Sequence, residues 1–450
     1  MKHLIIASTT YQCLSLAAAI DAGALPEGEK ILVLANSSRV PELTERLQDV
    51  AGFDRIAARF DAVVDLAELI YPRRPPQWAP RTEELPMWEK LLRSHWKLGT
   101  GPVSVLVDSI QVNPGLALAG VFRDAPLGAH SDGLMAYGPT RKALPLHFAQ
   151  RIERLVYIDL VPGLRPQLLR EYGPELHSVP AGALRKVVSE AAAAAEPEVR
   201  WLREQVGERR SALILGQYLA HLGLLSSEDE TALHVEMLRK AVSAQAEVCI
   251  FKPHPSAGPA AVQELQAEAA AAGIELIVAE TPVLAEVLLE VLSPALVAGC
   301  FSTGLATAKF VFGIETVAVG TERMLEALTP YENSNRIPVT IIDAVLCRGV
   351  PAPALAGPEE AGRPDRQLQP LIEAVAYCMQ SVNHPYLRDG AAEFLTAILG
   401  TESMRYFKRR RLTKLALPGA LPGPARPPAL RRFRRAGGRL TRRFLAVVSR

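Results

Sequence analysis

The chain has 450 residues, of which 49% are hydrophobic and 22% charged, which excludes a wholly disordered protein. This length exceeds one ordinary hydrophobic core, so two domains of roughly 200 residues each are expected. The formal net charge of +2 conceals an asymmetry, because residues 401–450 contain fifteen Lys and Arg against one acid, while the first 400 residues are acidic overall.

The first half alternates segments with the patterns of strands and helices. Short apolar segments predict buried strands at His3–Ser8, Lys30–Asn36, Val103–Ile110 and Val156–Val161. Apolar residues at helical spacing predict helices at Tyr11–Ala22, from Pro41 onwards, Pro86–Lys97 and Pro114–Phe122. Such alternation indicates βαβ units and a mostly parallel sheet.

The same alternation restarts after a predicted helical linker, Ala183–Val206. Strands are predicted at Ser211–Gln217, Val248–Pro253, Ile274–Val278, Ala295–Ala298 and Thr316–Val319. Helices are predicted at Glu230–Ala244, Ala260–Ala272, Pro282–Leu292, Thr307–Val311, Leu368–Val382 and Tyr386–Leu399. We therefore expect an α/β protein with two facing Rossmann-like domains, residues 1–207 and 208–400. The last two helices would pack back across both domains, and residues 401–450 would form a flexible basic tail.

Cysteine usage predicts a reducing compartment. The five cysteines show no CxxC spacing, and four are expected to be small buried side chains: Cys13, Cys249, Cys300 and Cys378. The apolar start of the chain is interrupted at Thr9, too early for a secretory signal, and no run reaches the roughly 18 apolar residues that span a bilayer. A cytoplasmic protein is expected.

Two predicted strands of the second half end in polar residues. One ends in Lys252-Pro253-His254-Pro255, and the other leads through Cys300 and Phe301 into Ser302-Thr303-Gly304 at a helix start. Open α/β sheets bind ligands at the carboxyl ends of their strands, and a helix start is a natural seat for phosphate. The two prolines restrict the backbone around His254, which suits a proton donor. These features indicate a transferase with a nucleotide-activated donor. From spacing alone, a histidine without a role and a simple Ser302 helix cap stay open.

Other nucleotide and metal sites are disfavoured by the sequence. The GxGxxG and GxxxxGK[ST] patterns are both absent. No His, Cys and Asp residues have metal-ligand spacing, so we expect no protein-bound metal and no cofactor. In the first half, Ser131-Asp132-Gly133 is by local sequence either a plain turn or a carboxylate at the mouth of the sheet.

Three motifs in order resemble those of the bacterial sialyltransferases, most closely the α-2,8-polysialyltransferase family. They are Ser131-Asp132-Gly133, His254-Pro255 and Ser302-Thr303, which are similar to the D/E-D/E-G, HP and Ser/Thr-pair motifs of that family. Thr9-Thr10-Tyr11-Gln12 and Tyr157-Ile158-Asp159-Leu160 support the resemblance, which covers residues 1–345.

The resemblance implies a GT-B fold with the active site between the domains, a CMP-activated sialic acid or related nonulosonic acid as donor, inversion, and no metal. His254 would protonate or hydrogen-bond the departing CMP phosphate, and Ser302, Thr303 and Gly304 would hold it. The nucleotide pocket would be lined by Lys252, Pro253, Pro255, Gly216 and Gln217, and Glu286 would hold the ribose hydroxyls. Gln12, Ser131, Asp132 and Gly133 would form the acceptor side, facing a glycan or lipid-linked acceptor.

The sequence departs from the family pattern at Ser131, where relatives usually carry the catalytic Asp or Glu. Asp132 is the candidate base, with His130 and Asp108 as alternatives, and a lost or changed activity is a further one. Competing functions are a CDP-glycerol-type polyol-phosphate transferase, a nucleotide-sugar 2-epimerase and a non-catalytic glycan- or nucleotide-binding protein.

The basic tail has two interpretations. It is either a disordered solubilising segment or a segment that docks the protein on an anionic membrane surface. Nucleic acid is disfavoured as a partner because the body of the protein is acidic.

Overall fold

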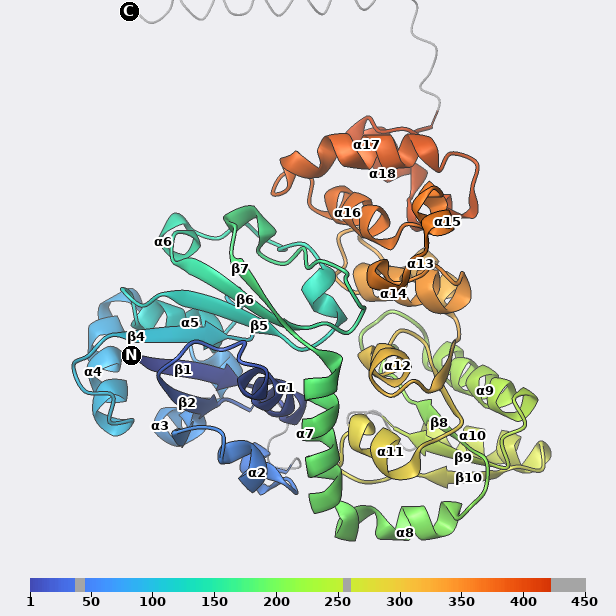
Figure 1. The fold of residues 1–450 in the computed structure, drawn as a ribbon, viewed down its shortest axis with the longest axis horizontal. Coiled ribbons are helices and arrows are strands. Elements are labelled where there is room, and N and C mark those ends of the chain that lie inside the picture. Colours follow the sequence, from blue (N-terminus) through green and yellow to red (C-terminus); the bar gives the residue numbers. More distant parts are fainter. Residues whose placement is uncertain (37–44, 254–259, 422–450) are drawn as a thin grey trace, which may run out of the picture.

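The computed structural model describes residues 1–36, 45–253 and 260–421, and it contains two parallel β-sheets surrounded by helices (Figure 1). The first sheet has the strand order β3-β2-β1-β4-β5-β6-β7. Its strands are β1 (Lys2–Ala7), β2 (Glu29–Leu34), β3 (Ala62–Asp65), β4 (Val103–Val107), β5 (Leu127–Ser131), β6 (Ile152–Ile158) and β7 (Glu175–Val179). The helices of this half are α1 (Thr10–Asp21), α2 (Phe53–Ala57), α3 (Leu66–Ile70), α4 (Leu85–His95), α5 (Gly115–Val121) and α6 (Leu146–Ala149).

The second sheet has the order β10-β9-β8-β11-β12. Its strands are β8 (Ser211–Leu215), β9 (Val248–Lys252), β10 (Glu275–Val278), β11 (Leu296–Gly299) and β12 (Glu315–Ala318). Helices α9 (Ser227–Ser243), α10 (Ala260–Ala271), α11 (Ala285–Leu292) and α12 (Thr303–Ala306) alternate with these strands. The predicted α/β class and the GT-B-like pair of Rossmann-like sheets are therefore confirmed.

The degree of burial of each strand explains whether it could be predicted from the sequence. The apolar core strands β1 and β8 are buried along almost their whole length, so their sequences are runs of apolar residues. The strands β3 and β7 were not predicted, because β3 is only half-buried and β7 is an edge strand with mostly exposed residues. The third unpredicted strand, β5, contains Gly128 and His130 in place of an apolar run. The helix predicted from Pro41 lies partly outside the described residues.

Both sheets have a switch point where the strand order reverses. In the first sheet this point lies between β1 and β4, and in the second between β8 and β11. Strands on either side of such a point send their following chain in opposite directions, which leaves a crevice outside their carboxyl ends. The topology therefore marks the ends of these four strands as the places for ligands.

Two helical segments join the halves. Helix α7 (Ala181–Ala194) packs against α1 of the first half and α11 of the second, and Figure 1 shows it running between the two sheets before α8 (Glu196–Val206). The Ser189 hydroxyl donates a hydrogen bond of 2.6 Å to Glu290 of α11. Further along the chain, α16 (Leu368–Met379) returns to the first half, because Gln369 accepts from the Arg165 backbone N–H at 2.7 Å and Glu373 pairs with Arg170 at 2.6 Å. The predicted packing across both domains is thus observed for α16.

The remaining helices form a cap above the second sheet (Figure 1): α13 (Thr321–Ala327), α14 (Arg336–Ile342), α15 (Pro358–Ala361), α17 (Arg388–Ala397) and α18 (Arg409–Leu415). Residues 401–421 were expected to begin a flexible tail, but they belong to this cap. Tyr406, Phe407, Leu412 and Leu417 are all buried, and Arg411 donates to the Cys378 carbonyl at 2.6 Å. The apolar residues interleaved with the basic ones explain why this part of the tail is folded.

One expectation on composition is also met in the described part of the chain. Cys13, Cys249, Cys300 and Cys378 are buried free thiols. Within residues 1–36, 45–253 and 260–421, no helix combines the length and the apolar character needed to cross a membrane.

Candidate functional site

Polar side chains gather at the switch point of the first sheet. Ser8 directly follows β1 and Asp108 directly follows β4, and the Ser8 hydroxyl donates to the Asp108 carboxylate at 2.8 Å. The Ser8 backbone N–H donates to Gln12 Oε1 at 2.7 Å, which fixes the Gln12 side chain at the start of α1. Gln12 in turn hydrogen-bonds to Asp132, which follows β5. The predicted acceptor-side residues Gln12 and Asp132 are therefore in contact.

Asp132 lies in an environment that disfavours its charge. Burial raises the pKa of Asp132, the neighbouring Asp108 carboxylate adds to the rise, and His130 and the Gln12 hydrogen bond oppose it. A carboxylate with a raised pKa is a stronger proton acceptor, which is the property that a general base needs near neutral pH.

The two alternative bases have other partners. Nε2 of the buried His130 lies 2.7 Å from the Ile6 carbonyl oxygen, so this nitrogen carries a proton that it donates. Asp108 accepts from Ser8 and, at 2.8 Å, from the Ser109 backbone N–H. Asp132 also accepts from two donors, the Gln12 side chain and its own backbone N–H, and it differs from His130 in having no proton to donate when charged.

The switch point of the second sheet holds Gly216 and Gln217. The Gly216 N–H donates to the Lys252 carbonyl at 2.9 Å, and a Cβ on Gly216 would lie 2.9 Å from that oxygen, so the glycine allows the ends of β8 and β9 to meet. Gln217 Oε1 accepts from the Phe301 N–H at 3.4 Å, across the switch point. The Gln217 N–H donates to the buried His234, whose pKa burial lowers to about 4. His234 is thus a neutral acceptor that holds Gln217.

Ser302, Thr303 and Gly304 form the start of α12, as predicted. The Ser302 side chain caps the helix by accepting from the Gly304 N–H at 3.2 Å. Gly304 is buried, and a Cβ there would lie 2.9 Å from Cδ1 of Leu215 of β8, so a larger residue would have to displace the Leu215 side chain.

The acidic motif and the Ser/Thr pair meet across the two halves of the molecule. A Cβ on Gly133 would lie 3.0 Å from Thr303 Oγ1, and the Leu134 N–H donates to that same oxygen at 3.5 Å. These two motifs are 169 residues apart where they touch. The structure therefore brings together one motif from each sheet, at the carboxyl ends of the strands.

Glu286 and Tyr11 complete this cluster. Glu286, in the first turn of α11, is only 7% exposed, and burial raises its pKa to about 7, with the charge of Asp132 adding to the rise. The Tyr11 hydroxyl is buried beside the Thr307 side chain, and its pKa is raised by burial and by the charges of Glu286 and Asp132. Sequence reasoning missed Tyr11 as a site residue, although its place beside Gln12 was the available signal.

The remaining predicted donor residues lie at the end of β9. Lys252 is half-buried, its ammonium group donates to the Thr281 carbonyl, and burial lowers its pKa to about 8. Pro253 follows it and packs near Gly216. His254 and Pro255 lie outside the described residues. Ser131 is the last residue of β5, where it pairs with Tyr157 of β6.

No three His, Cys, Asp or Glu side chains of the described ranges gather in a way that would hold a metal ion.

Comparisons with known proteins find one family and several distant structures. The sequence model of the alpha-2,8-polysialyltransferase family matches residues 3–321, which is more than half of the chain. No curated protein matches the sequence.

Solved structures with a similar arrangement include two sialyltransferases. One is a sialyltransferase GT-B domain from Photobacterium damselae, with 11% identity, a TM-score of 0.42, and coverage of 76% of this chain and 96% of that chain. Another is a 2,6-sialyltransferase from a Photobacterium species, in complex with CMP and lactose, with 12% identity, a TM-score of 0.43 and coverage of 76% of each chain. A glycosyltransferase from Rickettsia africae has 12% identity, a TM-score of 0.39, and coverage of 89% and 99%.

Proposed function

Because the chain belongs to the alpha-2,8-polysialyltransferase family and is therefore a glycosyltransferase, we propose that it moves a sialic acid from a CMP-activated donor to a glycan acceptor with inversion. The sugar is a sialic acid or a related nonulosonic acid, and the acceptor is a free or lipid-linked glycan.

One observation supports this proposal above the others. Gly133 and Leu134, beside the candidate base Asp132, touch Thr303 at the helix start that would hold the donor phosphate. An inverting transfer needs the acceptor base and the leaving-group site on opposite sides of one sugar, and each of the two sheets supplies one of them.

In the proposed reaction, Asp132 takes the proton of the acceptor hydroxyl while that oxygen attacks the anomeric carbon of the donor sugar. The bond from this carbon to the CMP phosphate breaks at the same time, and the electron pair stays on the phosphate. His254 gives a proton to the departing phosphate, while the hydroxyls of Ser302 and Thr303 and the first N–H groups of α12 stabilise its negative charge. The product is CMP and the elongated glycan, and no step uses a metal ion or a cofactor.

The side-chain environments favour Asp132 as the base despite Ser131 at the first position of the motif. Asp108 and His130 are both held by hydrogen bonds to neighbouring groups. Asp132 has a raised pKa and contacts Gln12, which orients it. In this proposal Glu286 holds the ribose hydroxyls and Lys252 lines the nucleotide pocket.

The test is a transfer assay on the full chain with CMP-activated sialic acid and an oligosaccharide acceptor, in which both CMP release and elongated product are measured. Asp132→Asn should lower the turnover number by roughly 100- to 10,000-fold with CMP binding kept, because Asn cannot accept the proton. The control is Asp389→Asn, a change of the same kind on the exposed face of α17, which should leave turnover unchanged.

Two outcomes would contradict the proposal. Full activity of Asp132→Asn would remove Asp132 as the base. An absence of CMP release and product from the unaltered chain, with several acceptors, would exclude the sialyl transfer itself.

We also propose that the protein works at the cytoplasmic face of an anionic membrane, through the basic residues of its C-terminal segment. Arg405, Lys408 and Arg411 are held by partners within the protein, and although Arg409, Arg410 and Lys414 are exposed, most of the basic charge lies in the segment from residue 422 onwards. It contains nine arginines and no acidic residue.

A further inference from the structure

A second site lies in the helical cap, away from the cluster around Asp132 and Thr303. It is a cavity of about 570 Å³, within the range of pockets that hold small molecules. It opens beyond the carboxyl end of β12, between α9, α13, the π-helical turn Asp343–Cys347 and the cap segment at Arg405. Its lining residues, none of which belongs to the proposed transfer site, are Glu236, Gly320, Thr321, Glu322, Arg323, Glu326, Asp343, Cys347, Arg348 and Arg405.

The lining has an unusual composition for a pocket, because it contains no aliphatic and no aromatic side chain. Apart from Gly320 and Cys347, every lining side chain is charged or carries a hydroxyl group. A nucleobase or an acyl chain would find no aliphatic or aromatic side chain there to pack against, whereas most small-molecule pockets offer several. The ligand must therefore be polar over most of its surface.

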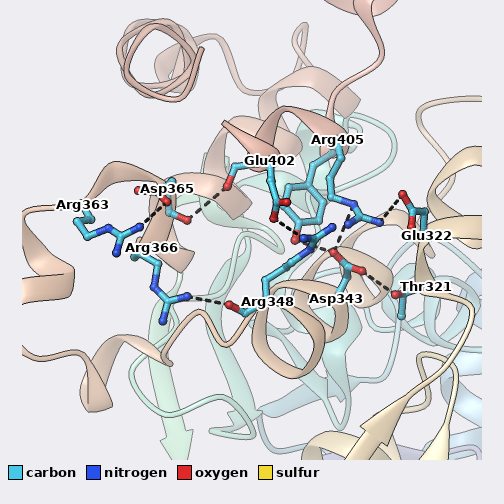
Figure 2. Close-up of polar contacts among 11 residues, drawn as sticks. Thr321, Glu322, Asp343, Arg348, Arg363, Asp365, Arg366, Glu402 and Arg405 are labelled. Carbon is cyan, nitrogen blue, oxygen red and sulfur yellow. Dashed lines mark hydrogen bonds and ion pairs between the residues drawn. The ribbon is translucent and has the colours of Figure 1, made fainter. Parts of the chain in front are cut away.

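A hydrogen-bonded wall fixes one side of the cavity (Figure 2). Asp343 is 1% exposed and accepts from the Thr321 hydroxyl at 2.6 Å and from the Tyr406 hydroxyl at 2.8 Å. Arg405 bridges Glu322 at 3.0 Å and Asp343 at 3.8 Å, and Arg348 pairs with Glu402. This wall is assembled before any ligand arrives, so little side-chain entropy is lost on binding.

Other lining groups have unused hydrogen-bonding capacity. Within the described part of the chain, neither Arg323 of α13 nor Glu236 of α9 makes a hydrogen bond or an ion pair. A guanidinium group binds a carboxylate or a phosphate through two parallel hydrogen bonds, and a carboxylate accepts hydrogen bonds from hydroxyl groups. The cavity thus offers one free cation together with acceptors on the neighbouring helices.

We propose that this cavity binds an anionic saccharide, a polyhydroxylated ligand with one carboxylate or one phosphate group. Arg323 pairs with the anionic group, and Glu236 and Glu326 accept from ring hydroxyls. The four carboxylates of the lining disfavour a ligand with several anionic groups, so a ligand with one anionic group and many hydroxyls fits best. This site is separate from the proposed transfer site, and its occupant regulates or anchors rather than reacts.

The experiment is calorimetric titration of the full chain with three probes: N-acetylneuraminic acid, glucose 6-phosphate and neutral N-acetylglucosamine. We expect saturable binding of at least one anionic probe. The probe that binds more tightly shows whether the site prefers a carboxylate or a phosphate group. Arg323→Ala should weaken that binding roughly tenfold or more, and Glu236→Gln should weaken it less.

Two control variants separate this site from others. Arg200→Ala removes an exposed arginine from the remote helix α8 and should leave the affinity unchanged. Thr303→Ala alters only the proposed transfer site and should also have no effect. Binding of neither anion, equal binding of the neutral sugar, or an affinity that depends on Thr303 and not on Arg323 would each overturn the proposal. Arg323 is exposed, so its replacement is not expected to unfold the protein.

Discussion

At the scale of single residues, the most informative group is Glu286, because it is a carboxyl group buried between the two halves of the protein. Its pKa of about 7 lies well above the ordinary value of 4.5, mainly because burial disfavours the charged form. The folded protein therefore holds this proton more tightly than the unfolded chain does. The contribution of Glu286 to the free energy of unfolding is therefore fully present below about pH 4.5 and is lost as the pH rises towards 7.

Glu286→Gln should remove this dependence, because Gln keeps the shape of the side chain and does not titrate. Relative to the unaltered protein, the variant should gain up to about 3 kcal/mol between pH 4.5 and pH 8. Thermal unfolding at both pH values measures the gain. Glu393→Gln, an exposed change on α17, serves as the control. A difference between variant and parent that stays constant with pH would contradict a buried, titrating Glu286.

At the scale of elements, the loop after β5 and the start of α12 form one contact between the two sheets. Gly133 fits against Thr303 because it has no Cβ, and the methyl group of Gly133→Ala would lie 3.0 Å from Thr303 Oγ1. We expect a loss of about 1 kcal/mol, since overpacking forces one of the two elements to shift.

A double variant tests whether this loss arises at Thr303. Thr303→Ala removes the clashing oxygen, so Gly133→Ala should cost less in its presence, by more than about 0.5 kcal/mol. Chemical or thermal unfolding of the four proteins gives the coupling. Gly182→Ala, in α7 with nothing within 4 Å, is the matched control and should not destabilise the protein. Strictly additive changes in the free energy of unfolding would mean that the added methyl group does not clash with Thr303.

Sequence patterns predicted the elements better than the contacts between them. The buried strands β1, β8 and β9 are runs of apolar residues, and the Ser302 cap follows a local preference, so both could be predicted. The contact of Gly133 with Thr303 depends on how two domains face each other, which no local pattern encodes. Tyr11 was missed for the same reason, since its neighbours Asp132 and Glu286 come from distant segments. The wall around Asp343 needs residues from three separate cap segments.

At the scale of the whole molecule, the C-terminal region divides into a folded part and the segment from residue 422 onwards. A chain that ends at Thr401 would lose four buried side chains (Tyr406, Phe407, Leu412 and Leu417) and would leave Asp343 without two of its partners. We expect its melting temperature to fall by roughly 10 °C or more. A chain that ends at Leu421 should melt within about 1 °C of the full chain, and calorimetry of the three proteins decides between these values. Equal melting of the two truncated chains would contradict the packed role of residues 402–417.

The chain that ends at Leu421 is also the right protein for testing membrane attachment, because it loses nine arginines and keeps the folded cap. The full chain should sediment with vesicles that contain anionic lipid, and the shortened chain should not. Raising the salt concentration should release the full chain, since the attraction between exposed charges is screened. Equal sedimentation of both chains would contradict membrane attachment through the segment from residue 422 onwards.

The attachment of the two halves at several places has a mechanical consequence. Helix α7 packs against α1 and α11. Elsewhere, α16 contacts Arg165 through a hydrogen bond and Arg170 through an ion pair. The turn Leu134–Tyr137 of the first half also packs against α14, so the halves are joined at more than two places and cannot rotate freely about a line through two of them. The 3.5 Å hydrogen bond between Leu134 and Thr303 lies beside this additional contact, and a phosphate bound by the Thr303 hydroxyl, as proposed above, would compete with that hydrogen bond locally.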